Sequence, residues 1–171
     1  MDFIIYLTLF LFGLFFRTGY ELLKEKRKVR GDNKILFAAL LVVMTLMWMS
    51  WFAMCPLDPV RLNVTGTVGS LGLAVEAAGL ILALAALVQL RGLENIKQLV
   101  TSGLFARIRH PMYLGFVLWI IGCTLQHGAV VSFAAGLVGI ANIIYWGKLE
   151  NARLEAAYGD EYLRYRSRTW F

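Results

Sequence analysis

Long apolar runs separated by short basic segments dominate the pattern along the chain. Residues 35–54 contain no charge, and as a helix these 20 residues would span about 30 Å, the thickness of the hydrocarbon core of a bilayer. Residues 3–16 form a shorter apolar run, for which we expect a helix over about residues 3–18, and residues 71–90 form one of full length that contains Glu76. The pattern predicts three transmembrane helices over these ranges.

The last apolar stretch, from Met112 to Gly147, contains no Lys, Arg, Asp or Glu. Its middle carries the polar sequence Gln126-His127-Gly128, where a tight turn would produce two antiparallel helices. We therefore expect a helical hairpin over residues 112–126 and 129–147. The hairpin and the first three helices together predict an all-α integral membrane bundle of five transmembrane helices. The bundle forms one membrane domain that covers residues 1–171.

The basic residues fall almost entirely on one side of this topology. The connection 17–34, the connection 91–111 and the tail from Lys148 contain all of the Lys and Arg residues except Arg61. The positive-inside rule then predicts a multi-pass protein with its N-terminus outside and its C-terminus cytosolic. Beyond Gly159, which offers a helix break, aromatic and basic residues interleave, and we expect a cytosolic amphipathic tail on the membrane surface.

The composition fits this picture, with 59% hydrophobic and 16% charged residues over 171 positions. The net charge of +6 comes from basic residues that fall on one side of the expected membrane topology, which explains them without nucleic acid. We therefore expect lipophilic partners and no nucleic acid. Cys55 and Cys123 belong to no CxxC or His/Cys cluster, which predicts buried small side chains and no metal site. The first apolar run lacks a basic n-region and a cleavage site, so we expect a mature helix rather than a signal peptide. Oligomeric state is not indicated.

Candidate chemistry begins directly before the hairpin, in the sequence Arg107-Ile-Arg-His-Pro-Met-Tyr-Leu-Gly115. Pro111 suits the first turn of a helix, and the preceding cations would lie beside the exposed amide donors of that turn. This arrangement can bind an anion. The alternative is that Arg107 and Arg109 are topological anchors and that His110 only caps the helix.

The geometry of a hairpin brings Glu150 into the same region. A turn near His127 places His110 level with Tyr145, and Glu150 lies five residues further, about 7.5 Å along the helix. One cytosolic pocket could then hold His110, Glu150 and the loop 102–109. The alternative is an ordinary interfacial ion pair between Glu150 and an arginine, which contributes little if it is exposed.

Glu76 is an ionisable residue inside a transmembrane helix, a position that often marks function. On the expected topology it lies near the outer side, far from the cytosolic pocket. We interpret it as structural, paired with Arg61 or reaching the outer interface.

An ordered set of short motifs runs through the C-terminal part of the chain. It consists of Leu99-Val-Thr-Ser-Gly-Leu-Phe105, then Arg109-His-Pro-Met-Tyr-Leu-Gly115, then Glu150 with Leu154 and Tyr158-Gly-Asp-Glu-Tyr162, followed by Tyr165. The set resembles the C-terminal signature of the isoprenylcysteine carboxyl methyltransferase and phospholipid methyltransferase superfamily. The resemblance marks residues 99–171 as the cofactor-binding region.

The resemblance implies a membrane-embedded methyltransferase that binds S-adenosylmethionine without a Rossmann domain or a metal. Its acceptor would be lipophilic: an isoprenylcysteine-like carboxylate, a phospholipid amine or a thiol. His110 and Tyr113 would hold the methionyl carboxylate end, and Glu150 and Arg109 would be the catalytic residues. The full implied set of cofactor-binding residues is Gly103, Leu104, Phe105, His110, Tyr113, Leu114, Gly115, Glu150, Tyr158 and Tyr162.

The sequence departs from the family pattern at two positions. Asn151 stands where a second glutamate is usual, and Leu104 replaces a common proline, so the second carboxylate is missing. Methyl transfer still suits so sparse a site, because the sulfonium supplies an activated methyl group and the protein chiefly aligns the nucleophile. A partly dehydrated pocket favours an anionic acceptor, since charge is neutralised during transfer. An amine acceptor would need a base, and Glu150 is the nearest candidate.

Two other functions fit parts of the pattern. Membrane reductases of the sterol reductase type resemble the same C-terminal region but use a nicotinamide cofactor, and their chains are usually longer than these 171 residues. A non-enzymatic small membrane protein would use the charged loop only as a topology signal, and it would bind neither cofactor.

Overall fold

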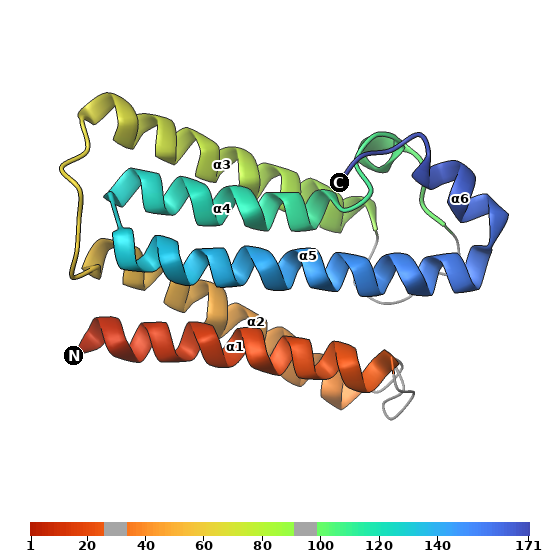
Figure 1. Cartoon of the computed structure of the whole chain (residues 1–171), viewed down its shortest axis with the longest axis horizontal. Coiled ribbons are helices and arrows are strands. Elements are labelled where there is room, and N and C mark those ends of the chain that lie inside the picture. Colours follow the sequence, from red (N-terminus) through yellow and green to blue (C-terminus); the bar gives the residue numbers. More distant parts are fainter. Residues whose placement is uncertain (26–33, 91–98) are drawn as a thin grey trace.

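The computed structural model describes residues 1–25, 34–90 and 99–171, which fold into α-helices and two short 3-10 turns (Figure 1). The described residues contain no β-strand, so the all-α prediction is confirmed. The basic residues expected between 26 and 33, together with Arg91 and Lys97, lie outside the described residues. The elements are α1 (Asp2–Glu25), α2 (Lys34–Met54), η1 (Cys55–Leu57), α3 (Gly66–Gln89), η2 (Gly103–Ala106), α4 (Pro111–His127), α5 (Val130–Tyr158) and α6 (Asp160–Arg166).

The long helices lie side by side and form a bundle with two distinct ends (Figure 1). α4 packs against α3 and α5, whereas α1 packs against α2 and α5. One end holds the N-terminus, η1 and the turn between α4 and α5. The other end, here named the α6 end, holds η2, the start of α4 and α6. Apart from Arg61, the described basic residues belong to segments at the α6 end.

Among the described residues, four helices are long and apolar enough to cross a membrane: α1, α2, α3 and α5. α4 has 17 residues. At the helical rise per residue this corresponds to about 25 Å, a little less than the hydrocarbon core. The prediction of a multi-pass membrane protein is confirmed by four candidate spans, and α4 lies between α3 and α5 as the partner of α5.

Two helices extend beyond the ranges expected from hydropathy. α1 continues to Glu25, so the prediction that a connection begins at Arg17 is wrong. An ion pair between Arg17 and Glu21, one helical turn apart, supports this extension. α3 begins at Gly66 rather than at residue 71, because the Thr65 hydroxyl accepts a hydrogen bond from the Val68 amide and caps the helix.

α5 also runs past its expected end at residue 147 and continues to Tyr158. Its 29 residues correspond to about 44 Å, so its last turns reach beyond the thickness of a bilayer core. Gly159 then adopts a positive φ of 52°, which favours glycine, and the chain turns into α6. The long α5 carries Glu150 and Asn151 to the start of α4.

The hairpin of α4 and α5 is confirmed, with Gly128 at the turn in the left-handed region (φ 60°). The Asp58 carboxylate, which is 4% exposed, caps the start of α5: it accepts hydrogen bonds from the Ser132 amide and the Ser132 hydroxyl, both at 2.6 Å. Burial opposes ionisation of Asp58, but these bonds and those from the Val60 and Val131 amides lower its pKa below the usual value.

Close packing of α3 and α4 depends on glycines on both helices. A Cβ atom on Gly115 would lie 2.7 Å from the carbonyl oxygen of Gly79 and 2.9 Å from the Cβ of Ala83. Aromatic rings fill the space between α2 and α4, where Trp48 lies 4.8 Å from Phe116 and 5.1 Å from Trp119 between ring centroids. The helices therefore approach by backbone contact on one side of α4 and by aromatic contact on the other.

Cys55 and Cys123 are buried free thiols at the end of the bundle opposite α6, as expected from the sequence. Glu76 is partly buried on α3, and its Oε2 has no hydrogen-bond partner within the described part of the chain. The expected ion pair between Glu76 and Arg61 does not form among the described residues.

Candidate functional site

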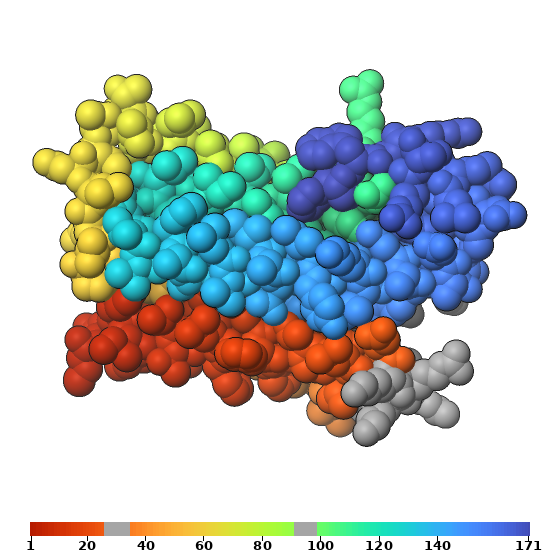
Figure 2. All heavy atoms as spheres, viewed as in Figure 1, coloured from red at the N-terminus to blue at the C-terminus, as the bar shows by residue number. Residues whose placement is uncertain are grey.

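A cavity of about 560 Å³ extends from the α6 end into the bundle. Its apolar wall comes mainly from α2, α3 and α4, and includes Leu40, Met44, Trp48, Leu84, Phe116 and Trp119. Its polar wall comes from α1, α4, α5 and the loop after η2, and includes Arg17, Glu21, Arg109, His110, Glu150 and Arg153. The volume lies in the range typical of small-molecule sites. Figure 2 shows α3, α4, α5 and α1 packed side by side over one face of the molecule.

His110 occupies the centre of the polar wall, directly before the first residue of α4. The side chain is buried, and its Nε2 lies 2.7 Å from Asn151 Oδ1. Its Nδ1 lies 3.7 Å from Glu150 Oε2, and its ring stacks on Tyr113 with centroids 5.3 Å apart. His110 is the N-cap residue of α4, and its carbonyl accepts from the Leu114 amide, but its side chain makes no capping hydrogen bond. Glu150 thus pairs with this histidine.

Asn151 holds the His110 ring in its orientation. Burial raises the pKa of Tyr162, so its hydroxyl stays protonated at neutral pH and donates to Asn151 Oδ1 over 2.5 Å. The same oxygen faces His110 Nε2, and an oxygen that accepts from Tyr162 also accepts from a protonated Nε2. His110 Nδ1 is thereby directed at Glu150. Asn151 thus positions the imidazole.

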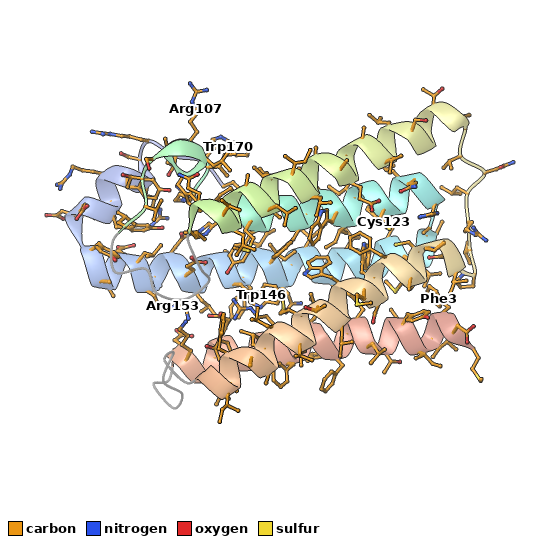
Figure 3. The ribbon with its side chains drawn as sticks, turned by 180° about the vertical axis from the view of Figure 1, so that it is seen from behind. Phe3, Arg107, Cys123, Trp146, Arg153 and Trp170 are labelled. Carbon is orange, nitrogen blue, oxygen red and sulfur yellow. The ribbon has the colours of Figure 1, made fainter. Side chains whose placement is uncertain are left out.

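The C-terminal segment is attached to the loop that precedes α4. The Tyr165 hydroxyl donates to the carbonyl oxygen of Phe105 over 2.8 Å, and burial raises the pKa of Tyr165 to about 12, which keeps this donor protonated. Trp170 bonds the loop through its backbone, accepting from the Arg109 amide and donating to the carbonyl of Arg107. In Figure 3 the Arg107 side chain points away from the helices and Trp170 lies beside this loop.

Arg109 lines the cavity and also holds the C-terminal segment. Its Nη1 donates to the carbonyl oxygens of Arg166 (3.0 Å) and Thr169 (2.9 Å). Its Nε is buried with no hydrogen-bond partner among the described residues, while the side chain lines the cavity. An unsatisfied cationic donor of this kind is suited to an anionic ligand group.

A second group of charges comes from α1, which sequence reasoning did not connect with the site. Glu21 is 1% exposed and forms ion pairs with Arg17 on α1 and with Arg153 on α5, the latter at 2.6 Å. The Arg17 guanidinium lies over the Trp146 ring, 5.5 Å from its centroid. Figure 3 shows Trp146 and Arg153 on α5 facing the side where α1 and α2 lie.

The structure brings only part of the expected site residues onto the cavity wall. The expected residues that line it are Phe105, Arg109, His110, Tyr113, Glu150 and Tyr158. The expected residues that do not line it are Gly103, Leu104, Leu114, Gly115 and Tyr162. Gly103 and Leu104 lie against Gln89, whose side chain donates to Ser102 O and accepts from the Leu104 amide. Gly115 faces α3, and Tyr162 supports His110 from behind through Asn151.

The chemistry of this wall fits the cofactor that the sequence implies. S-adenosylmethionine has an amino-acid end with a carboxylate and an amine, a sulfonium and an aromatic base. The wall offers the unpartnered Arg109 Nε and the His110 imidazole for the carboxylate, the Glu150 carboxylate for cationic groups, and the Phe105 and Tyr158 rings for the base.

The segment that resembles known proteins contains Arg109, His110 and Glu150 of the polar wall. Residues 89–161 match the model of the phospholipid methyltransferase family. A segment of 76 residues is 33% identical to the protein-S-isoprenylcysteine O-methyltransferase of Schizosaccharomyces pombe, covering 41% of this chain and 30% of that protein. No solved structure matches the chain significantly. The matched segment spans less than a third of that relative's length, and over this C-terminal region the resemblance to the isoprenylcysteine and phospholipid methyltransferase superfamily is confirmed.

Proposed function

We propose that this protein is a membrane-embedded methyltransferase that uses S-adenosylmethionine to methylate a lipophilic acceptor. The observation that carries the proposal is the cavity, in which the polar cluster of Arg109, His110 and Glu150 adjoins an apolar wall from α2, α3 and α4. The polar cluster lies within the residues that match the methyltransferase family. A hydrophilic cofactor and an apolar acceptor could therefore meet in one site.

The proposed arrangement in the membrane follows from helix lengths and charge. We infer that α4 crosses with α5 as a fifth span, and that the basic α6 end faces the cytosol, which places the N-terminus outside. The cofactor would then reach the cavity from the cytosol. The acceptor would reach it from the bilayer, between α2 and α3, since α2 packs on α1, α3 packs on α4, and both line the cavity.

The residues of the polar wall have distinct roles in this proposal. Bound S-adenosylmethionine supplies an activated methyl group on its sulfonium. His110, Tyr113 and the Nε of Arg109 hold the methionyl carboxylate, and Asn151 keeps the imidazole in the orientation that this requires. The apolar wall excludes water, which favours steps that neutralise charge.

Removal of a proton depends on the acceptor. An anionic acceptor needs no base, whereas an amine or a thiol would pass its proton to Glu150, the carboxylate on the wall nearest to His110. His110 Nδ1, at 3.7 Å from Glu150, could share that proton. Asn151 has an amide in place of a carboxylate and cannot accept it.

Calorimetry on the detergent-purified chain tests the proposal. S-adenosylmethionine and its demethylated product should bind, NADPH should not, and His110→Ala and Glu150→Ala should weaken binding. Arg61→Ala is the matched control and should bind as the wild type does, because Arg61 pairs with Ala129 at the opposite end of the bundle. If neither methyl cofactor binds, the proposed function is wrong, and binding of NADPH alone would favour the reductase. Labelled methyl transfer to a host lipid extract would then define the acceptor class.

A further inference from the structure

The segment after α6 turns back along the protein and ends beside the start of α4 (Figure 1). The Trp170 amide donates to the carbonyl oxygen of Arg107 over 3.0 Å, and the Trp170 carbonyl accepts from the Arg109 amide over 3.1 Å. These two bonds fix the end of the chain against the loop before α4. Arg107 and Trp170 do not belong to the described wall of the cavity, so their position is separate from the proposed methyl-transfer site.

Trp170 is a large apolar side chain that the fold leaves exposed. It is 57% exposed although its backbone is bonded on both sides. The Phe171 ring lies against it with centroids 6.3 Å apart, and Leu163 on α6 is also exposed. A fixed and exposed tryptophan at the end of a membrane bundle is typical of a side chain among lipid headgroups, because the indole is apolar but carries one N–H donor.

Arg107 supplies a cation next to this tryptophan. Its side chain is exposed and points away from the helices (Figure 3). Arg164 and Arg168 are exposed on the C-terminal segment, and within the described part of the chain none of these three arginines forms an ion pair. The described residues therefore leave three guanidinium groups available to an anion from outside the protein.

The level of Arg107 in the bundle indicates what its side chain faces. α4 begins directly after this loop, and the end of α3 contacts η2 at the start of the loop. Arg107 thus lies where two apolar helices end, which in a membrane is the level of the lipid headgroups. The exposed carboxylates of the C-terminal segment, Asp160 and Glu161, are at the start of α6, whereas Trp170 follows its other end.

We propose that Arg107 and Trp170 form a binding site for the headgroup of an anionic phospholipid in the leaflet next to the α6 end. The Arg107 guanidinium binds the phosphate, and the Trp170 ring packs at the boundary between headgroup and acyl chains. Arg164 and Arg168 add attraction over a longer range. A zwitterionic headgroup brings its own cation, which cancels much of this attraction. The lipid in this site is a ligand and is not methylated, and it attaches the C-terminal segment to the membrane surface.

Quenching of Trp170 by brominated lipids tests the site. The full chain is placed in nanodiscs that contain phosphatidylcholine and phosphatidylglycerol in equal amounts, with bromine on the acyl chains of one lipid or of the other. The difference between the wild type and Trp170→Phe isolates Trp170, since quenching of the other tryptophans is common to both. Brominated phosphatidylglycerol should quench Trp170 as if it were enriched about fivefold over phosphatidylcholine, the ratio expected for one arginine near an anionic lipid.

Charge variants at Arg107 separate binding of the headgroup from general contact with lipid. Arg107→Gln should lower the enrichment to less than about twofold, whereas Arg107→Lys keeps the charge and should retain most of it. Added salt should weaken the enrichment, because the site is exposed. Arg61→Gln is the matched control and should keep the wild-type enrichment, because Arg61 pairs with Ala129 at the opposite end of the bundle.

Three results would overturn the inference. If the two brominated lipids quench Trp170 equally, the site does not select an anionic lipid. If neither lipid quenches it, Trp170 does not lie at the bilayer. If the enrichment persists in Arg107→Gln, this arginine does not bind the headgroup. The proposed methyltransferase stands in all three cases, since its cofactor binding is measured separately by calorimetry.

Discussion

Asn151 provides the most direct test of how the site is built, because one oxygen atom holds two donors. Its Oδ1 lies 2.7 Å from His110 Nε2 and 2.5 Å from the Tyr162 hydroxyl, and both donors belong to buried residues. Asn151→Leu keeps a similar volume and removes the acceptor. Each buried donor left without a partner costs about 1–3 kcal/mol, so we expect the loss of both partners to lower the free energy of unfolding by about 2–6 kcal/mol.

Loss of the Asn151 acceptor should lower both the stability of the protein and its affinity for the cofactor. A change of about 2–6 kcal/mol corresponds to a decrease in Tm of roughly 4–24 °C for a chain of this size. Because the His110 imidazole is no longer fixed, binding of S-adenosylhomocysteine should also weaken, by about tenfold or more. Thermal unfolding in detergent and calorimetry on the same preparation measure the two quantities.

Two further variants make the series quantitative. Tyr162→Phe removes one of the two donors and leaves the bond between Asn151 and His110, so it should cost about 1 kcal/mol and change cofactor affinity little. Asn151→Asp keeps an acceptor for both donors and should retain binding. If Asn151→Leu has the stability and affinity of the wild type, Asn151 does not position His110 and the assignment of roles in the polar wall is wrong.

Three other predictions follow from the packing at either end of the bundle. Asp58→Asn should cost about 1–3 kcal/mol at neutral pH. Because the pKa of Asp58 is lowered by folding, the difference from the wild type should be full above about pH 4 and shrink as the pH falls further, and a pH-independent difference would contradict this. Gly115→Ala should lower the free energy of unfolding by about 1–3 kcal/mol through contact with Gly79, whereas Gly19→Ala, which meets no atom within 4 Å, should be neutral or stabilising. Arg109→Met should speed limited proteolysis of the C-terminal segment, and an unchanged cleavage rate would show that Arg109 does not hold it.

The sequence was sufficient for the hairpin and for the meeting of His110 and Glu150, because both follow from local rules. A polar turn in a charge-free stretch sets the pairing of two antiparallel helices, and the helical rise then fixes which residues lie level. The structure places His110 Nδ1 3.7 Å from Glu150 Oε2. Even the role of Asn151 could have been anticipated, since it follows Glu150 on α5 and lies close to the same histidine.

Contacts between distant segments could not be predicted in this way. Arg17 follows an apolar run, and a positive charge in that position usually marks the cytosolic end of a transmembrane helix. The sequence pattern therefore places Arg17 in the connection 17–34. Its spacing of four residues from Glu21 was the available evidence that the helix continues. Nothing in the sequence indicated that Arg153 on α5 would share Glu21, because that ion pair depends on how α1 packs against α5.

For Arg109 and Gly115, the role expected from the motif differs from the position that the residue has in the structure. Short motifs identify residues but not the direction of their side chains. Gly115 belongs to the same motif as His110, yet five residues further along α4 it faces α3, where its small size allows backbone contact with Gly79. Arg109 lines the cavity, but its Nη1 is used to hold the C-terminal segment. One motif thus serves binding, helix packing and attachment of the tail.

This distribution of residues suggests how acceptor and cofactor recognition could vary independently. The residues proposed to bind the cofactor lie within the part of the chain that matches the methyltransferase family, whereas Arg17 and Glu21 lie on α1, and much of the apolar wall belongs to α2 and α3. A change in α1 or α2 can alter the shape and charge that face the acceptor without moving His110, whose partners are on α4 and α5. Recognition of the acceptor would then be a property of the helices that surround the shared cofactor site.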